Sequence, residues 1–429
     1  MNEMSKGFTR SALGEGIWIS RITDKRFKTN RVSVNFILPL AAGTAARNAI
    51  LPPLLHKACQ DYPDFRRLNQ RLGELYGAFL DTEVRKVGSL QVLNFSIRTI
   101  DNRYALAGED LLFDCAKLLC DLIMRPLLVD GKFVEENFAV EKQVLMDDIR
   151  SKINDKRGYA ISRCEEILFA GSALAVDELG DLESAQALTN EDAVQAYREM
   201  LRTARVEVMV TGADFSQAAA DYVKDSFAAL ERIPFSGAQE LAAPVAAEDT
   251  VERMDVKQSK MVLGFSAPMV GEGELSAFRM MTAMYGGTPV SKLFLNVREK
   301  LSLCYYCVSR FDRLKGILMV DCGVENQNIE KAREEILRQL ADMQKGAFTA
   351  DEISAAQLRL RNSFTSLTDS LGGIENWYLT QICCGTEFSP EEEAEKIAAV
   401  TPEQIQAAAG KLELKAVYVL TGKEEGERK

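Results

Sequence analysis

The sequence has one histidine and two tryptophans among 429 residues, and it contains no long uninterrupted run of uncharged apolar residues. A membrane-spanning helix needs about twenty such residues, so we expect neither a span nor a membrane partner. Residues 1–11 lack the apolar stretch of a secretory signal, so no signal peptide is expected. Long runs of Lys and Arg are also missing, and the net charge is -11. Repulsion between two polyanions therefore excludes nucleic acid as the expected partner.

The nine cysteines are odd in number and scattered, which is unlike the disulfide framework of a small secreted protein. This usage predicts reduced thiols and a cytoplasmic location. The composition, 47% hydrophobic and 27% charged, is that of a folded globular chain. Its length exceeds one ordinary hydrophobic core, so two or more domains are expected.

Hydrophobic periodicity predicts alternating strands and helices. Apolar residues at every second position of Arg31–Leu38 predict a half-buried strand. Leu90–Ile97 has the same pattern with a change of phase between Val92 and Leu93, which predicts a β-bulge there. Apolar residues at helical spacing predict a helix over Asp110–Met124 with one buried face.

Similar signals recur in the same order in both halves of the chain, which favours an internal duplication. The paired signals are helix N-caps at Thr189 and Thr401, glycines at Gly171 and Gly385, and the segments Leu68–Arg71 and Leu295–Arg298. Pro, Gly and small residues between the halves indicate a linker. We therefore predict one domain over 1–231, a linker over 232–250 and a second domain over 251–429.

The most informative segment is Met280–Arg310, whose pattern predicts a helix, a glycine turn, a second helix and a strand. Its centre reads Met-Tyr-Gly-Gly-Thr-Pro-Val-Ser-Lys-Leu-Phe-Leu-Asn-Val-Arg-Glu-Lys-Leu-Ser-Leu-Cys-Tyr. This resembles the second-domain signature of the insulinase/pitrilysin-like metallopeptidases, in which Ser-Lys/Arg-Leu-Phe precedes Arg-Glu-Lys-x-Gly-Leu-Ala/Cys-Tyr. The sequence departs from that signature at Ser302, where the family usually has Gly.

The resemblance implies that Arg298 and Tyr305 bind the backbone of a peptide substrate. A guanidinium offers a fork of donors to carbonyl or carboxylate oxygens, and a phenol can donate to an oxyanion. Both are binding groups rather than proton-transfer groups. The alternative is structural: Arg298 would pair with an acidic neighbour, and Tyr305 would face the core.

The family's zinc motif, His-x-x-Glu-His, is lost. The corresponding segment is about Ala49–Asp61, in which His56 is the only histidine of the chain and Ile50–Gln60 contains no carboxylate. A catalytic zinc site needs three protein ligands and a base, so we predict no metal, no cofactor and no enzyme activity by this chain alone. Glu141 and Asp148 resemble the helix that supplies the family's third ligand. We interpret Asp148 as a solvated or salt-bridged helix residue and His56 as a hydrogen-bonded structural histidine.

Two further patterns are weaker. Cys304 and Cys307 have redox spacing, but the surrounding segment predicts a strand, in which these side chains would point to opposite faces. Gly286–Gly287 is not a phosphate loop, because no Gly-Lys-Ser/Thr follows it. The acidic stretch Pro390–Glu393 is typical of the first turn of a helix.

The resemblance implies an α+β fold of two homologous domains, each a mixed, mostly antiparallel sheet covered by helices, arranged as a clam shell. Family members of this size commonly pair a zinc-bearing subunit with one that has only the Arg/Tyr signature. Among the inactive bacterial members, some are associated with the aminopentanol modification of elongation factor P.

Three hypotheses follow. The chain is a non-catalytic subunit that binds peptide and pairs with a zinc-bearing homologue as a heterodimer, or with itself. It is instead a purely structural or scaffolding homologue. In the third hypothesis it is an enzyme with a rebuilt site, for which the sequence offers only Cys304 and Cys307.

Overall fold

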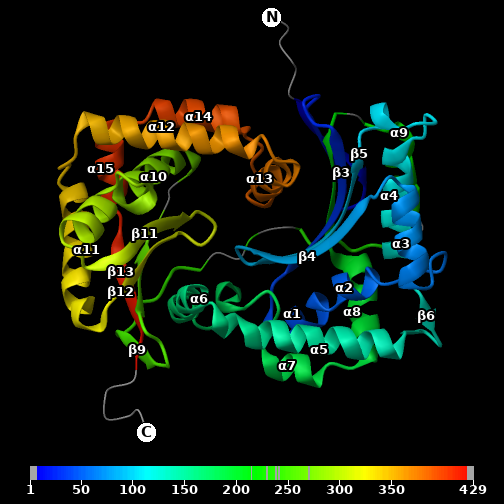
Figure 1. Cartoon of the computed structure of the whole chain (residues 1–429), viewed down its shortest axis with the longest axis horizontal. Helices are drawn as coiled ribbons and strands as arrows, with labels where there is room; N and C mark the ends of the chain where they lie inside the picture. Colours follow the sequence, from blue (N-terminus) through cyan, green and yellow to red (C-terminus); the bar gives the residue numbers. More distant parts are fainter. Residues whose placement is uncertain are drawn as a thin grey trace, which may run out of the picture. The chain divides into compact units, whose positions relative to one another are not determined.

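The computed structural model describes residues 7–422 except 214, 229, 237, 238, 240, 241, 269 and 270. Residues 1–6 of the segment for which no signal peptide is expected, and four residues of the predicted linker, therefore lie outside the described residues. The chain forms two compact units, each with a sheet and covering helices (Figure 1). Unit 1 comprises Met1–Arg150, Val176–Gln239 and Thr368–Glu387, and unit 2 comprises Ser151–Ala175, Glu240–Leu367 and Phe388–Lys429.

Unit 1 contains a six-stranded sheet in which only the β2–β8 pair is parallel. In spatial order its strands are β1 (Gly7–Gly14), β2 (Ile17–Thr23), β8 (Arg205–Gly212), β3 (Thr29–Pro39), β5 (Leu90–Ile100) and β4 (Phe79–Val87). A short hairpin, β6 (Leu128–Val129) and β7 (Lys132–Phe133), is separate from this sheet.

The helices of unit 1, except α13 and η1, share a large apolar core with the sheet. They are α1 (Ala42–Ala49), α2 (Leu51–Leu55), α3 (Phe65–Glu74), η1 (Asn102–Tyr104), α4 (Leu111–Met124), α5 (Glu135–Ser151), α7 (Leu182–Ala187), α8 (Asn190–Thr203), α9 (Gln217–Ala228) and α13 (Leu371–Cys383). The apolar face of α4 contributes Leu111, Cys115 and Leu118 to this core, as the sequence predicts.

Unit 2 contains a five-stranded sheet in which only the β13–β9 pair is parallel. In spatial order its strands are β11 (Cys304–Asp312), β12 (Ile317–Val324), β10 (Ser259–Ser266), β13 (Glu413–Thr421) and β9 (Thr250–Arg253). Its helices are η2 (Lys152–Asn154), α6 (Lys156–Leu168), η3 (Ala173–Ala175), η4 (Glu272–Glu274), α10 (Leu275–Thr282), η5 (Ala283–Gly287), η6 (Leu293–Lys300), η7 (Asn326–Asn328), α11 (Ile329–Gln344), α12 (Ala350–Leu367), α14 (Pro390–Ala398) and α15 (Pro402–Gly410).

The two sheets repeat one topology. The order β2-β8-β3-β5-β4 in unit 1 corresponds to β9-β13-β10-β12-β11 in unit 2, with the parallel pair at the same place. Thr189 and Thr401 each form a capping box, and each capped helix leads to the strand of the parallel pair. This common topology confirms the predicted α+β fold of two related domains.

The units interleave along the chain. Helix α13, from the second half of the sequence, belongs to unit 1, where Glu375 accepts a hydrogen bond from Arg31 Nε at 3.1 Å. Helix α6, from the first half, belongs to unit 2. Its Leu168 packs so closely against Gly264 that a Cβ added to Gly264 would lie 2.6 Å from Cδ1 of Leu168. The predicted linker at 232–250 divides the chain into its two homologous halves, and this division stays a prediction. The compact units differ from these halves, because each unit is built from several separate segments of the chain.

Most predicted elements form. Strand β3, helix α4 and helix α14 cover the segments that the sequence assigns to them. The predicted bulge between Val92 and Leu93 is wrong, because β5 pairs with β3 and β4 without a shift of register. Val92 and Leu93 point to opposite faces of the sheet, and both are buried. Apolar residues can therefore follow one another here without a bulge. Across the part of the chain that the structure describes, no helix is long and apolar enough to cross a membrane.

Candidate functional site

A pocket of about 370 Å³ in unit 2 brings together the two residues that the signature singles out. It lies where η6 leads into β11 and η7 follows β12. The residues that line it are Arg298, Glu299, Ser302, Leu303, Cys304, Tyr305 and Glu325. A cation, two carboxylates, a phenol and a thiol therefore share one small depression.

The helix that carries Arg298 is packed into the fold, but the guanidinium of Arg298 remains accessible. Its helix is anchored by the buried side chains of Leu293 and Val297. The guanidinium lies 4.6 Å from the ring centre of Phe294, and its Nε is 3.6 Å from a carboxylate oxygen of Glu299. Because both members of this ion pair are about half exposed, at 42% and 54%, the pair contributes little to stability. The guanidinium keeps donors for a ligand.

Tyr305 is 64% exposed and lines the same pocket, so it does not face the core. It occupies the point in β11 where the register with β12 shifts between Cys304 and Tyr306. A bulge of this kind inserts an extra residue and redirects its side chain. The structural alternative is met only in part: Arg298 pairs with an acidic neighbour, Glu299, but both members of that pair are about half exposed, and Tyr305 does not face the core.

Ser302, at which the chain departs from the signature, has a backbone conformation that favours glycine. Its φ is +49°, in the left-handed region that glycine adopts readily and other residues adopt at a cost of about 1–2 kcal/mol. The family's Gly therefore matches a backbone path that this chain retains with serine. The turn at Ser302 brings β11 back from η6 and so places Tyr305 beside Arg298.

We expect Ser302→Gly to raise the free energy of unfolding by about 0.5 kcal/mol. Relief of left-handed strain is partly offset by the greater freedom of glycine in the unfolded chain. Ser302→Ala is the matched control and should give no gain, because alanine keeps the Cβ. Chemical denaturation of the three proteins measures the difference. A glycine variant that is less stable than the alanine variant would contradict this account of the turn.

The helices before the pocket are wound more widely than an α-helix. Both η5 and η6 are π-helical, a rare geometry that occurs frequently at functional sites. Gly286 is needed for close packing here, since a Cβ would lie 2.6 Å from the backbone nitrogen of Ser309 on β11. Gly286 thus allows η5 to pack closely against β11.

The segment corresponding to the zinc motif lies at the end of α2 in unit 1. His56 follows α2, and its side chain is hydrogen-bonded to the backbone of Leu80. Burial lowers the pKa of His56, so the ring is neutral at pH 7. His56 is thus partly buried and hydrogen-bonded within the fold.

The two acidic residues that resemble those of the family's third-ligand helix have different surroundings. Glu141 on α5 is 5% exposed, and its carboxylate lies 2.7 Å from Nζ of Lys57. Asp148, two turns further along α5, is exposed. With one imidazole held by a backbone carbonyl and the buried carboxylate held by an ammonium group, these residues do not fit zinc. Among the described residues, no group of three His, Cys, Asp or Glu could hold a metal ion.

We expect Lys57→Met to lower the free energy of unfolding by about 1–3 kcal/mol, because it leaves the Glu141 carboxylate buried without its partner. The double variant Lys57→Met/Glu141→Gln should recover most of that loss, since the buried charge is then removed. Urea denaturation of the single and double variants measures the effect. The ion-pair account fails if Lys57→Met changes stability by less than about 0.5 kcal/mol.

The expectation for Cys304 and Cys307 is wrong. The bulge at Tyr305 changes the alternation of β11, so Cys304 pairs with Val324 and Cys307 pairs with Cys322. Residues 322 and 324 lie on one face of β12, and the three cysteines therefore share a face. Their thiols form hydrogen bonds with one another. A simple period of two gives no signal for a bulge, which is why the sequence does not predict this cluster.

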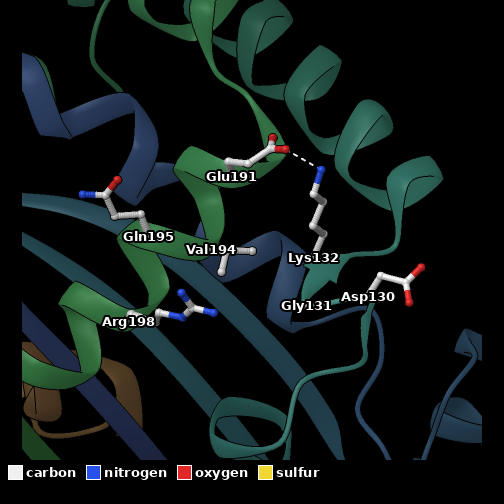
Figure 2. A pocket seen from close by; sticks show the side chains of 7 residues that line it. All are labelled: Asp130, Gly131, Lys132, Glu191, Val194, Gln195 and Arg198. Atoms are coloured by element: carbon white, nitrogen blue, oxygen red, sulfur yellow. Dashed lines mark hydrogen bonds and ion pairs between the residues drawn. The ribbon is translucent and has the colours of Figure 1, made fainter.

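A second pocket, of about 500 Å³, lies in unit 1 between the β6–β7 turn and α8. Figure 2 shows Glu191 and Lys132 pointing toward each other across it and forming an ion pair. It is otherwise lined by Asp130, Gly131, Val194, Gln195 and Arg198. None of the residues singled out by the sequence lies here, and the two central charges neutralise each other. Arg298 and Tyr305 remain the better candidate site.

Comparison with known proteins supports the resemblance. Residues 187–360 match the family described as Peptidase M16 inactive domain. The chain is 28% identical over 414 residues to "Probable inactive metalloprotease YmfF" of Bacillus subtilis, covering 95% of this chain and 96% of that protein. The chain is therefore similar to the M16 peptidase family. This is the insulinase/pitrilysin-like family that the Met280–Arg310 signature predicts.

Solved structures share the fold of this chain. A conserved protein from Enterococcus faecalis superposes with a TM-score of 0.90 at 28% identity, covering 98% of this chain and all of that one. A protease from Helicobacter pylori superposes with a TM-score of 0.79 at 15% identity. The match covers 97% of this chain and all of that protein, and it shows that the two have the same fold. The Bacillus subtilis relative is named as an inactive metalloprotease, and the sequence of the present chain lacks the zinc motif.

Proposed function

We propose that this chain is a non-catalytic subunit that binds peptide at the Arg298–Tyr305 pocket and pairs with a zinc-bearing homologue, which performs the hydrolysis. The observation that carries the proposal is that both side chains are exposed on one pocket instead of being used inside the fold. In this proposal the second domain, 251–429, supplies the binding signature, and the first, 1–231, has lost the metal.

The chemistry of the pocket suits a peptide backbone. Arg298 and Tyr305 donate hydrogen bonds, and peptide carbonyls accept them. Strand β11 is the outermost strand of its sheet, so its outer edge has backbone groups with which an extended peptide can pair. Glu299 and Glu325 line the same pocket and would favour a basic side chain or an amino terminus.

The need for a partner follows from the lost motif. A chain with a single histidine cannot supply the two that the family's helix uses, whereas several relatives are named zinc proteases. One of these, "Uncharacterized zinc protease SCO5738" of Streptomyces coelicolor, is 23% identical over 303 residues, covering 68% of this chain and 65% of that protein. A homologue of that kind, encoded in the same genome and located with this chain in the cytoplasm, is the partner that we propose.

Co-expression with such a homologue, followed by size-exclusion chromatography, tests the pairing. The expected result is a stable one-to-one complex that cleaves unfolded polypeptides faster than the homologue alone. The control is this chain expressed by itself, which shows whether it associates with a second copy. Separate elution of the two chains, with no effect on the homologue's rate, would contradict the proposal and favour a scaffolding role.

A further inference from the structure

The three cysteines at the start of β11 and on β12 form a layered cluster beneath the pocket. Cys304 is partly exposed and lines the pocket, whereas Cys307 and Cys322 are buried, at 2% and 0% exposure. Cys307 and Cys322 lie directly opposite each other in the β11–β12 register. A solvent-accessible thiol therefore has two buried thiols within hydrogen-bonding reach.

This arrangement differs from that of the other cysteines. Cys59, Cys115, Cys120, Cys164 and Cys383 are buried, and burial raises their pKa, so they remain unreactive thiols. Cys384 is also partly exposed, but it does not line the pocket. Cys304 alone combines access through this pocket with two adjacent thiols.

The surroundings of Cys304 favour its thiolate form. Hydrogen bonds with Cys307 and Cys322 lower the pKa of Cys304, burial opposes them, and the positive charge of Arg298 adds to the lowering. The acidic side chains lining the pocket are Glu299 and Glu325, and the phenol is that of Tyr305. The thiolate is the form that attacks oxidants and electrophiles.

We propose that Cys304 is a peroxide-sensitive thiol that forms a reversible disulfide with one of the two buried cysteines behind it, Cys307 or Cys322. This inference concerns the thiols themselves and does not depend on peptide binding or on a partner.

The reaction with a peroxide balances in two steps. The Cys304 sulfur attacks a peroxide oxygen, so that an S–O bond forms, the O–O bond breaks and hydroxide leaves, giving a sulfenic acid. The buried thiol then loses its proton and attacks the Cys304 sulfur, so that an S–S bond forms, the S–O bond breaks and water leaves. Two thiols are oxidised by two electrons, and hydrogen peroxide is reduced to two molecules of water.

The sequence makes the products easy to distinguish. Trypsin releases Cys304 and Cys307 together in peptide 301–310, and Cys322 in peptide 316–331. A Cys304–Cys307 disulfide lowers the mass of peptide 301–310 by two hydrogen atoms. A Cys304–Cys322 disulfide joins the two peptides.

The experiment treats the full-length reduced chain with hydrogen peroxide, blocks the remaining thiols with N-ethylmaleimide and analyses tryptic peptides by mass spectrometry. We expect Cys304 to react about tenfold faster than Cys384 in the same molecule. One of the two disulfides should form and be reversed by dithiothreitol. Cys304→Ser should abolish it, and Cys384→Ser, the matched control, should leave it unchanged.

A second variant tests the order of the steps. In Cys307→Ser/Cys322→Ser the oxidation should stop at a sulfenic acid on Cys304, trapped by dimedone. The proposal is overturned if Cys304 reacts no faster than Cys384, or if the disulfide that forms excludes Cys304. The comparison of Cys304 with Cys384 uses the unmodified protein, so it holds even if a variant fails to fold.

Discussion

Arg298→Ala is expected to reduce kcat/KM of the assembled pair by about ten- to a hundredfold while leaving assembly intact. A charge-assisted hydrogen bond contributes about 1.5–3 kcal/mol, and about 1.4 kcal/mol corresponds to a factor of ten. Tyr305→Phe should reduce it less, because water can partly replace the phenol. Peptide-cleavage rates and melting curves measured on the same reconstituted pair give both quantities.

The structure predicts that the melting temperature of the Arg298 variant is nearly unchanged. Arg298 is 42% exposed and pairs only weakly with Glu299, so its removal should alter stability by less than about 0.5 kcal/mol. Lys300→Ala is the matched control, since it removes an exposed cation from the same helix outside the pocket. A stable, assembled Arg298→Ala variant with unchanged turnover would refute the binding role.

The second large effect concerns metal. Elemental analysis of the purified chain, dialysed without chelator, should find less than about one tenth of a zinc ion per molecule, because a catalytic site needs three protein ligands and the segment around His56 offers one imidazole. Cleavage of unfolded polypeptides by the chain alone should be slower than by the pair by a factor on the order of a thousand or more.

Chelation provides the control for this second prediction. A chelator should stop cleavage by the pair, and added zinc should restore it, without changing the melting curve of this chain alone. One zinc ion per chain, or chelator-sensitive cleavage by this chain without a partner, would contradict the hypothesis that this chain is a non-catalytic subunit.

Several features could be predicted from sequence because they depend on neighbouring residues. The caps at Thr189 and Thr401 need only the residue three positions on, and both form capping boxes. The Arg298–Tyr305 pair is placed by a contiguous signature that runs from helix to strand. The loss of the zinc motif follows from the count of histidines.

Other features depend on contacts between distant segments and could not be predicted. The pairing of Lys57 with Glu141 joins residues far apart in the chain, and neither spacing nor composition indicates it. Helix α6 lies in the first half of the sequence but belongs to unit 2, and helix α13 lies in the second half but belongs to unit 1. This assignment depends on the unit in which each helix packs. The cluster around Cys304 depends on a one-residue bulge, which reverses the faces that simple alternation predicts.

The most direct test of the account is whether this chain, by itself and without metal, binds peptide through Arg298 and Tyr305. Fluorescence anisotropy of fluorescein-labelled casein, titrated with the chain in the presence of EDTA, measures this. We predict saturable binding whose affinity EDTA does not change. The Arg298→Ala substitution should weaken this affinity about tenfold, and Lys300→Ala should leave it unaltered. Binding that EDTA abolishes, or that is equally strong in Arg298→Ala, would contradict the account.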